Sequence, residues 1–283
     1  MIIVKIKCGL GNQMFQYALG RRLSLNWKDE LKFDLSWFSN LKKGDIPRDL
    51  EIDEFKIKLN QATEKEIFQA TPSFLSRTID RIKGRLNRNH FYRFYPGLLK
   101  KKKNIFLDGY FQSYKYFDSI RETLVNEFSL KNGYSKDGQE LKKEIEQAEQ
   151  SVALHIRRGD FITVSKNYNG LCSLDYYKKG LDIIKEKYSN IKLFVFSDDI
   201  EWAKNNLKFD DPMVFCSKPS LSSAEEILLM SLCKHQIIAN STFSWWAAWL
   251  NQNPFKIVVA PSVWLIVANI KTNDLIPSEW IKI

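Results

Sequence analysis

No hydrophobic run in the 283 residues reaches the roughly 18 apolar residues that a membrane-spanning helix needs. The first residues, MIIVKIKCGLGNQ, do not form a secretory signal, because their apolar run is short and glycines follow at once. The four cysteines, Cys8, Cys172, Cys216 and Cys233, form no CxxC pair and lack zinc-ligand spacing. We therefore expect a cytoplasmic protein whose cysteines are reduced and mostly structural, with no bound metal.

Two nucleotide-binding signatures are also missing, the phosphate loop GxxxxGK[ST] and the dinucleotide fingerprint GxGxxG. Their absence argues against an ATPase and against a dinucleotide-dependent enzyme. Low-complexity tracts and repeats at a fixed period are missing as well. What remains is a globular chain with 44% hydrophobic residues. Its length fits one large α/β domain or two domains of about 130 to 150 residues.

The excess of positive charge is concentrated in one segment. The net charge is +10, and residues 77–103 contain ten Lys or Arg and one Asp. Such a segment can contact nucleic acid, anionic lipid headgroups or an anionic substrate, or it can be a solvated surface with no specific partner. Its aromatic residues Phe91, Tyr92, Phe94 and Tyr95 favour peripheral contact with an anionic membrane, because aromatic rings sit well at headgroup depth. No recognisable nucleic-acid module accompanies the charge, so we expect no nucleic-acid partner.

The hydrophobic pattern predicts short strands that alternate with helices, which is typical of right-handed βαβ crossovers and a parallel sheet. A polar break with glycine at 131–138 indicates a domain boundary. We expect an α/β protein with domains at 1–135, which carries the basic insert 77–103, and at 136–283. Strands are predicted at 2–7, 31–36, 105–111, 152–157, 192–197, 213–216, 235–239 and 256–261. Helices are predicted at 14–28, 62–70, 76–86, 114–127, 137–149, 175–188, 222–234 and 242–252, with a short one from residue 201.

Four predicted strands end in polar clusters, and in parallel sheets ligands bind beyond the carboxyl ends of the strands. The first cluster is GLGNQ at 9–13. Here Gly9 and Gly11 permit close backbone approach, and the following helix start offers N–H groups to an anion. Asn12 and Gln13 add side-chain donors and acceptors. The alternative for this cluster is a tight turn that binds nothing.

The second cluster is HIRRGD at 155–160, at the end of a strand that reads as buried. Strand alternation places His155 and Arg157 on one face and Arg158 on the other. One arginine can then contact phosphate oxygens through its planar fork. The other packs against structure, paired with an acid such as Asp160. The alternative is a purely structural network of arginines and aspartates.

The third and fourth clusters are FSDD at 196–199 and ANSTFSWW at 239–246. Asp198 and Asp199 can bind a metal, accept from ribose hydroxyls or simply cap the next helix. The fourth cluster brings hydroxyl groups to a helix start, which favours a phosphate, although packing is the preferred role of its tryptophans as a group. Together the clusters predict a pocket for a nucleotide diphosphate. The candidate residues of the fourth cluster are Asn240, Ser241, Thr242, Ser244 and Trp245.

In this order and at these separations, GLGNQMFQYALG, HIRRGDF, FSDD and NSTFSWW resemble motifs of bacterial α-1,2-fucosyltransferases, glycosyltransferase family 11. The segments CSLDYYKKGL and EEILLMSLCKHQIIANSTFSWWAAWL also look like this family. The resemblance spans most of the chain and is weakest at 37–103. It implies a GT-B fold, in which two Rossmann-like domains with parallel sheets face each other across a cleft. The N-terminal domain would bind the acceptor and the C-terminal domain the donor.

The resemblance also implies an activity. It is the inverting transfer of L-fucose from GDP-β-L-fucose to the 2-hydroxyl of an acceptor, with no metal and no cofactor. The acceptor would be a glycan or lipid-linked oligosaccharide that ends in galactose, used in surface-polysaccharide or O-antigen biosynthesis at the inner face of a membrane. The alternatives are fucosyl transfer with another linkage, α-1,6 or protein O-linked, and a non-catalytic nucleotide-sugar-binding protein. The oligomeric state stays open.

Individual roles follow from the same resemblance. Arg157 would contact the diphosphate and His155 would lie beside the nucleotide. Asn12, whose amide is not basic at neutral pH, would position the acceptor. Asp160 is a candidate general base, and a structural partner of the arginines is the alternative. Glu226 would read the guanine or the ribose, unless it is a solvated acid in the first turn of its helix.

Overall fold

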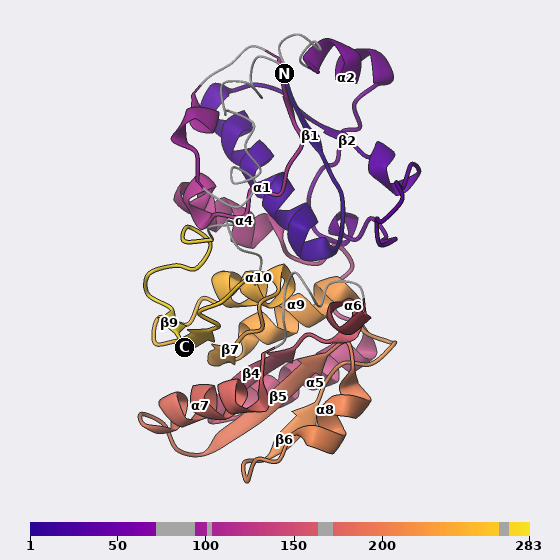
Figure 1. Ribbon diagram of the computed structural model, residues 1–283. Coiled ribbons are helices and arrows are strands. Elements are labelled where there is room, and N and C mark those ends of the chain that lie inside the picture. The colour runs from indigo at the N-terminus through magenta and orange to yellow at the C-terminus, as the bar shows by residue number, and fades with distance from the viewer. Residues whose placement is uncertain (72–93, 101–103, 164–171, 266–271) are drawn as a thin grey trace. The chain divides into compact units, whose positions relative to one another are not determined.

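The structure, a computed structural model, describes residues 1–71, 94–100, 104–163, 172–265 and 272–283, without the side chains of Asp160 and Thr163 (Figure 1). The predicted helix at 76–86 and most of the basic insert 77–103 lie outside these residues. None of the helices in the described part of the chain is both long and apolar enough to cross a bilayer.

The chain divides into two compact units. Unit 1 comprises Met1–Ser129 and Asn269–Pro277, and unit 2 comprises Leu130–Ala268 and Ser278–Ile283. Each unit is built from segments that are not contiguous, because residues 269–277 belong to unit 1 although the chain before and after them belongs to unit 2. The assignment of acceptor and donor to separate domains stays a prediction.

Unit 1 contains a three-stranded parallel sheet in the order β2-β1-β3. Its strands are β1 (Ile2–Lys5), β2 (Leu31–Asp34) and β3 (Ile105–Leu107). Its α-helices are α1 (Leu10–Trp27), α2 (Glu64–Ala70) and α4 (Arg121–Glu127). Short 3-10 turns lie at Ser36–Phe38, Ile52–Glu54, Pro96–Leu99, Tyr114–Tyr116 and Asp118–Ile120. The predicted helix at 114–127 is therefore two 3-10 turns followed by α4.

Helix α1 begins at Leu10, four residues before the predicted start. Gly9 caps the helix in an extended conformation, and its carbonyl accepts from the N–H groups of Asn12 and Gln13. The glycine cluster is thus the first turn of the helix and not a loop before it. Farther along, Gly20 lets α1 approach the sheet, since a Cβ there would lie 2.7 Å from Val4 Cγ2. The buried aromatic side chains of this unit include Phe15, Phe33, Phe55, Tyr116, Phe117 and Phe128.

Unit 2 contains a six-stranded parallel sheet in the order β6-β5-β4-β7-β8-β9. The strands are β4 (Gln150–Ile156), β5 (Ile191–Ser197), β6 (Met213–Phe215), β7 (His235–Ile237), β8 (Val258–Ala260) and β9 (Ile281–Lys282). The helices are α5 (Lys136–Gln147), α6 (Gly159–Thr163), α7 (Leu174–Lys185), α8 (Ile200–Asn206), α9 (Ser223–Leu232) and α10 (Thr242–Leu250). Strand β9 pairs with β8 and is an element that the hydrophobic pattern did not predict.

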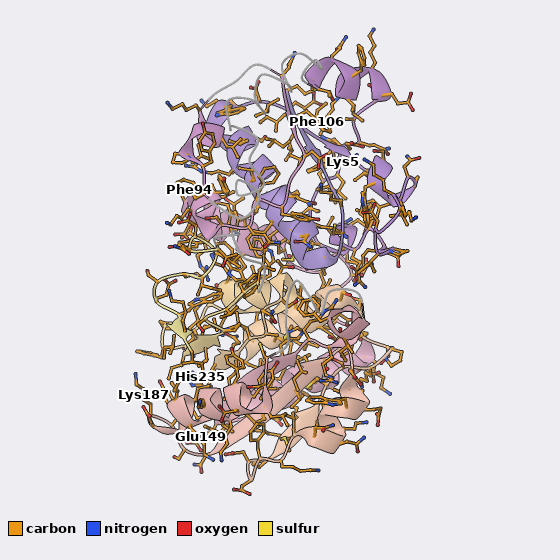
Figure 2. All side chains as sticks on the ribbon, viewed as in Figure 1. Lys5, Phe94, Phe106, Glu149, Lys187 and His235 are labelled. Atoms are coloured by element: carbon orange, nitrogen blue, oxygen red, sulfur yellow. The ribbon has the colours of Figure 1, made fainter. Side chains whose placement is uncertain are left out.

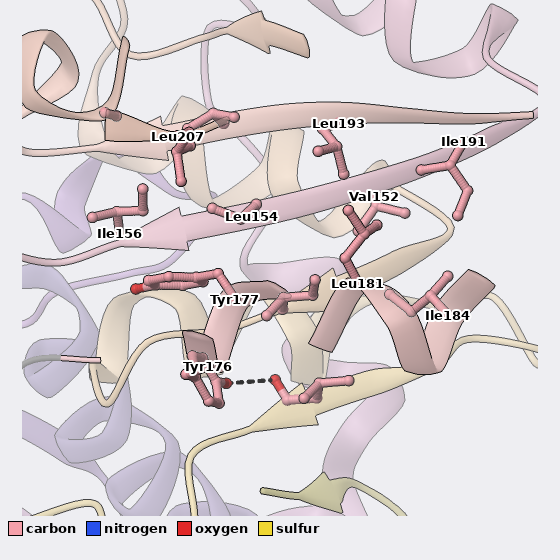
Figure 3. Close-up of a cluster of buried hydrophobic side chains, with 14 of the residues drawn as sticks. Val152, Leu154, Ile156, Tyr176, Tyr177, Leu181, Ile184, Ile191, Leu193 and Leu207 are labelled. Carbon is pink, nitrogen blue, oxygen red and sulfur yellow. Dashed lines mark hydrogen bonds between the residues drawn. The ribbon is translucent and has the colours of Figure 1, made fainter. Parts of the chain in front are cut away.

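Taken in chain order, the strands of unit 2 follow the doubly wound order 3-2-1-4-5-6 of a Rossmann fold. Helices α7 and α8 lie on one side of the sheet, and α9 and α10 lie on the other (Figure 1). Figure 3 shows the core between α7 and the sheet, where Tyr177, Leu181 and Ile184 pack on Val152 and Leu154 of β4. The prediction of an α/β protein with parallel sheets is confirmed.

Candidate nucleotide-binding site

The sheet of unit 2 has a topological switch point between β4 and β7. The chain first adds β5 and β6 on one side of β4, and then adds β7, β8 and β9 on the other side. The helices that connect the strands of the two halves therefore lie on opposite faces of the sheet. In such sheets the carboxyl ends of the two strands at this point border a ligand crevice. His155 and Arg157 lie at the end of β4, and α10 begins shortly after β7. The ring centroids of His155 and Phe243 are 5.6 Å apart, so the end of β4 and the start of α10 are in contact.

His155 is buried, with 4% of its surface exposed, and its Nδ1 has no hydrogen-bond partner in the described part of the chain. Burial, with a smaller effect from the charge of Arg157, lowers the pKa of His155 to about 3. The imidazole is therefore neutral at physiological pH and is not a proton donor of the imidazolium type. A buried polar atom without a partner at a switch point indicates a place for a ligand group.

The opposite end of the same sheet provides a contrast. His235 opens β7 (Figure 2), and its ring packs on Tyr188 at 4.5 Å between centroids. Its Nδ1 accepts from the N–H of Ile257 at 3.0 Å, and its Nε2 lies 3.2 Å from Gln150 Oε1. Both ring nitrogens thus have protein partners, as expected of a structural histidine. Only the carboxyl end of the sheet leaves a histidine nitrogen unpaired in the described residues.

The two adjacent arginines are each held by a different carboxylate. Arg157 Nη1 lies 3.0 Å from Asp198 Oδ2, and the two side chains are 22% and 24% exposed. Arg158 Nε lies 3.4 Å from Asp199 Oδ2, and its guanidinium stacks on the Trp202 ring of α8 at 3.7 Å. Because α8 and α10 lie on opposite faces of the sheet, Arg158 points away from the face that carries His155. Strand β4 ends at Ile156, before both arginines, and the predicted placement of Arg157 on the face of His155 stays a prediction.

Arg158 has a partner that the sequence did not indicate. Its guanidinium pairs with Asp199, 41 residues farther along the chain. The strands β4 and β5 lie side by side, so the segments that follow them meet. The expected pairing of Arg158 with Asp160 stays a prediction. The side chain of Asp160 lies outside the described residues, and its predicted role as a base stays a prediction.

Asp198 and Asp199 are occupied by contacts within the protein. Asp198 Oδ1 also accepts from the N–H of Arg158 at 2.8 Å. Its carboxylate lies so close to Gly159 that a Cβ there would be 2.5 Å from Oδ2, which explains the glycine of HIRRGD. Asp199 caps α8 by accepting from the N–H of Trp202. The capping alternative therefore holds for Asp199, and we find no group of three potential metal ligands among the described residues.

Glu226 lies in the first turn of α9, close to the carboxyl ends of β5 and β6. It is half-buried, and burial raises the pKa of its carboxyl to about 7. The Ser217 hydroxyl donates to it, which opposes the rise, and the charge of Asp198 adds to the rise. Ser217 Oγ also accepts from the N–H of Ser197, so one hydroxyl ties Glu226 to the end of β5. Glu226 is thus not a solvated surface acid, which was one of its two predicted alternatives. The other, contact with the guanine or the ribose, stays a prediction.

The start of α10 uses most of its polar side chains internally. Ser241 is the N-cap and accepts from the N–H of Phe243, and the buried Ser244 hydroxyl donates to the carbonyls of Ala239 and Ser241. The buried Asn240 amide donates to the Trp264 carbonyl. Asn240 and Ser244 are thus structural, contrary to their prediction as ligand-binding residues. Thr242 is partly exposed, and its predicted contact with a ligand stays a prediction. The same holds for the backbone N–H groups of the first turn, because a helix provides no carbonyl partners for them.

Trp245 was singled out as the tryptophan that could contact a ligand, and this prediction is wrong. The side chain has no exposed surface. Its ring contacts those of Trp246, Trp249 and Trp280 at centroid distances of 5.2 to 6.3 Å. The preferred interpretation of the tryptophans as packing residues therefore holds for all three on α10.

The glycine cluster of unit 1 also differs in part from its prediction. Gln13 is fully buried, and its Nε2 donates to the carbonyls of Cys8 and Asp49, each at 2.8 Å. Its Oε1 accepts from the N–H groups of Glu51 and Ile52. Gln13 thus fastens the 49–52 segment to the start of α1 and has no remaining capacity for a ligand. Gly11 and Asn12 lie in the first turn of α1, and Gly9 precedes it.

Sequence reasoning missed two glutamines that organise unit 1. The buried Gln16 accepts from the N–H of Lys7 at 2.9 Å and donates to the carbonyl of Gly109 at 3.2 Å, so it joins the segments that follow β1 and β3. Gln112 donates to Asn12 Oδ1 at 2.7 Å. A signal was present, since Gln16 lies one helical turn after Asn12 and Gln112 follows a predicted strand.

Comparisons with known proteins identify the family. The family model described as Glycosyl transferase family 11 matches residues 1–283. The chain is 34% identical to the O-antigen biosynthesis glycosyltransferase WbnK of Escherichia coli, with 97% of this chain and 98% of the relative covered. It is 31% identical to an alpha-1,2-colitosyltransferase of Escherichia coli, with coverage of 100% and 99%.

A solved structure supports the fold. The fucosyltransferase NodZ from Bradyrhizobium superposes with a TM-score of 0.52 at 13% sequence identity, covering 87% of this chain and 92% of its own. At this identity the likeness concerns the fold alone. It confirms the expected GT-B type.

Proposed function

Because the chain belongs to glycosyl transferase family 11, we propose that it transfers L-fucose from GDP-β-L-fucose to the 2-hydroxyl of a terminal galactose, with inversion and without a metal ion. The acceptor in this proposal is a glycan or lipid-linked oligosaccharide of O-antigen or related surface-polysaccharide biosynthesis. The names of the two Escherichia coli relatives, one for O-antigen biosynthesis and one for an α-1,2 linkage, support the acceptor class and the linkage.

One observation carries the donor half of the proposal. Arg157 and the first turn of α10 follow the two strands that border the switch point, and His155 Nδ1 at the end of β4 has no partner among the described residues. A guanidinium and a helix N-terminus are both phosphate-binding groups. Two such groups on adjacent strands suit the diphosphate of a nucleotide sugar. The ion pair with Asp198 does not exclude this role, because a guanidinium has five N–H donors.

The chemistry explains why a cation is needed at that point. During transfer the bond between fucose C1 and the β-phosphate oxygen breaks, and its electrons leave with GDP. The acceptor oxygen forms the new bond to C1 on the opposite face, and the proton of the acceptor hydroxyl goes to a base. Negative charge grows on the departing diphosphate, so preorganised donors there lower the barrier. We assign this task to Arg157 and to the amide groups of the first turn of α10.

Glu226 supports guanine as the base of the nucleotide. Guanine presents two adjacent N–H donors, at N1 and N2, which match the two oxygens of an ionised carboxylate. The pKa of Glu226 is about 7 without a ligand, so bound guanine would shift this carboxyl toward its ionised form. Asp198 and Asp199, which pair with Arg157 and Arg158, follow β5, and Ser217 ties Glu226 to the end of the same strand.

Two groups complete the proposed mechanism on the acceptor side. Asn12 would orient the acceptor hydroxyl, since its amide cannot take a proton at neutral pH. Asp160 remains the candidate for the base. The proposed peripheral contact with an anionic membrane rests on residues 77–103, most of which are outside the described part of the chain.

A second donor is favoured by one specific observation. A relative that matches this chain over its full length is named for transfer of colitose, which is fucose without its 3-hydroxyl. A site that hydrogen-bonds a substrate hydroxyl discriminates strongly against an analogue that lacks it. The two GDP-sugars therefore form a sharp pair of test substrates.

The test incubates the full chain with GDP-fucose or GDP-colitose and a panel of galactosides, and determines the product linkage by NMR. We expect fucose in α-linkage on O-2 of galactose. Turnover with GDP-colitose and not with GDP-fucose would show that the proposed donor is wrong. A product of another linkage would show that the proposed acceptor position is wrong. Binding of GDP-fucose without transfer or hydrolysis would support the alternative of a non-catalytic binding protein.

A further inference from the structure

We propose that unit 1 contains a carbohydrate-binding subsite formed by Lys7, Asp108, Tyr110, Asn12 and Gln112. Its ligand is a pyranose of the acceptor glycan, an assignment that rests on the proposed function. The subsite lies at the carboxyl end of the unit 1 sheet. It adds side chains that bind the acceptor to the groups already assigned to the donor.

The position follows from the strand order β2-β1-β3. The chain leaves β1 toward β2 on one side and returns to β3 on the other, so the switch point lies between β1 and β3. Strand β1 ends at Lys5 and β3 ends at Leu107. The segments that follow them, 6–12 and 108–113, carry the five residues. The same rule that locates the nucleotide site in unit 2 therefore locates a second crevice here.

A charged pair lies at the centre of this edge. Lys7 Nζ is 2.5 Å from Asp108 Oδ1, although the two residues are 101 positions apart in the chain. The Asp108 side chain is 47% exposed, so the carboxylate is held in place by the lysine while it stays open to solvent. Lys7 Nζ also lies 5.3 Å from the centre of the Tyr110 ring. The cluster thus presents a carboxylate and an ammonium group beside an aromatic ring.

The amide pair next to it is incompletely satisfied. Gln112 is 6% exposed and donates from Nε2 to Asn12 Oδ1 at 2.7 Å, while its Oε1 has no partner among the described residues. Exchanging oxygen and nitrogen in both amides would keep the bond and leave Gln112 Nε2 unpaired instead, so one polar atom lacks a partner in either assignment. The neighbouring Ser113 hydroxyl is also buried, and no other described residue is its partner. Buried polar atoms of this kind require a ligand or a water to satisfy them.

The cluster is preorganised by Gln16. This buried side chain accepts from the N–H of Lys7 and donates to the carbonyl of Gly109, so it fixes the spacing between the two segments. Gln13 anchors the intervening residue Cys8 through its carbonyl. Neither glutamine is available to a ligand. Their positions inside α1 make the edge rigid, which lowers the entropy cost of binding.

These groups match the chemistry of a sugar. A pyranose presents several hydroxyl groups that both donate and accept, together with an apolar face of C–H groups. Asp108 accepts from hydroxyls, Lys7 donates to them, and the amides of Asn12 and Gln112 do both. The Tyr110 ring provides a surface for the apolar face. The cluster differs from the site in unit 2, because no helix N-terminus is among its groups and its carboxylate is 47% exposed and can accept from sugar hydroxyls.

The test compares Asp108→Asn and Gln112→Met with a matched control, Glu66→Gln. Glu66 forms an equivalent pair with Lys32 at 2.5 Å, and it lies on α2, which Figure 1 shows beside the start of β1. Gln also preserves the capping box that Glu66 makes with Thr63. For Asp108→Asn we expect the KM for the galactoside to rise about tenfold, the effect of losing one charge-assisted hydrogen bond, with a smaller change in kcat. Gln112→Met should raise the same KM about threefold.

Two readouts separate this proposal from the proposed function. Hydrolysis of the GDP-sugar by water in the absence of acceptor should be unchanged in all three variants, and Glu66→Gln should match the wild type throughout. Binding of methyl β-galactoside, followed by a saturation-transfer NMR titration on the full chain without donor, should weaken about tenfold in Asp108→Asn. If the wild type binds the galactoside but transfers no sugar, the proposed function fails while the subsite stands. An unchanged galactoside KM and NMR signal in both variants, or an equal loss in Glu66→Gln, would overturn the subsite.

Discussion

We expect alanine substitution of Arg157 and of Arg158 to have opposite effects on two measured quantities, kcat and folding stability. Arg157 pairs with Asp198 at the end of β4, close behind His155, and we assign it to the departing diphosphate. Arg158 stacks on Trp202 on the other side. Arg157→Ala should therefore impair catalysis more than stability, and Arg158→Ala should do the reverse.

The magnitudes follow from the contacts. Removing Arg157 deletes a donor to a developing anion, which costs about 3–4 kcal/mol of transition-state stabilisation and lowers kcat by about 10²–10³. Its pair with Asp198 is 22% and 24% exposed, so the loss of folding stability should be no more than about 1 kcal/mol. Asp198 keeps the N–H of Arg158 as a partner and is not left as an unpaired buried charge. The corresponding fall in melting temperature is about 2–4 °C.

Arg158→Ala loses a 3.4 Å ion pair and a cation–π contact at 3.7 Å. A cation–π contact is worth about 0.5–2 kcal/mol, and that of Arg157 with the Phe161 ring is longer, at 5.4 Å, so Arg158→Ala should be the less stable of the two. Its kcat should stay within about tenfold of wild type, because the side chain stacks on Trp202 and pairs with Asp199 and is not assigned to the diphosphate. The assay measures GDP release at saturating donor and acceptor alongside thermal unfolding of each variant.

Two results would refute this reasoning. One is a folded Arg157→Ala enzyme whose kcat stays within tenfold of wild type. The other is an equal loss of kcat in the two variants, which would mean that the arginines act together as one structural network. The second outcome would restore the alternative interpretation of HIRRGD as a purely structural element.

Two further predictions concern Glu226 and Trp245. If ionised Glu226 binds guanine, GDP affinity should be constant well above pH 7 and should fall about tenfold per pH unit below its pKa of about 7, since the protonated carboxyl cannot accept both N–H bonds. Calorimetry across this range checks it, and Glu226→Gln should bind GDP weakly with a flat profile; a pH-independent wild type would contradict the assignment. Trp245→Ala should destabilise the protein by about 3–5 kcal/mol through the cavity it leaves, as chemical denaturation would show. Trp245→Phe should keep wild-type GDP affinity, and a large loss of affinity in that folded variant would return Trp245 to the binding site.

Much of unit 2 could be predicted from the sequence, because its strands and helices have clear local periods. The strand at 192–197 and the helix at 222–234 were found to within one or two residues. Strand β9 was missed because two residues carry no periodic signal, and its pairing with β8 depends on the chain leaving unit 2 at 269 and returning at 278. The start of α1 was missed because glycines usually end or precede helices, whereas Gly11 lies inside this one.

The site residues divide in the same way. Strand ends and helix starts can be read from short stretches, so HIRRGD, FSDD and the start of α10 could be recognised as edge clusters. Which side chains remain available for a ligand could not be read. Gln13 bonds to the carbonyl of Asp49 and Asn240 to that of Trp264, which are distant in the chain, and Trp245 contacts Trp280, 35 positions away. Satisfaction of a polar group is a property of its surroundings and not of its sequence neighbours.

The sequence by itself determined that two charged arginines follow a buried strand, since a run of apolar residues before them is a local signal. The tertiary structure decided their partners. Arg157 meets Asp198 and Arg158 meets Asp199 because β4 and β5 are hydrogen-bonded neighbours whose ends coincide. Lys7 meets Asp108 for the same reason, through the pairing of β1 with β3. An isolated charge becomes part of a site only when strand pairing brings a second segment of the chain to the same edge.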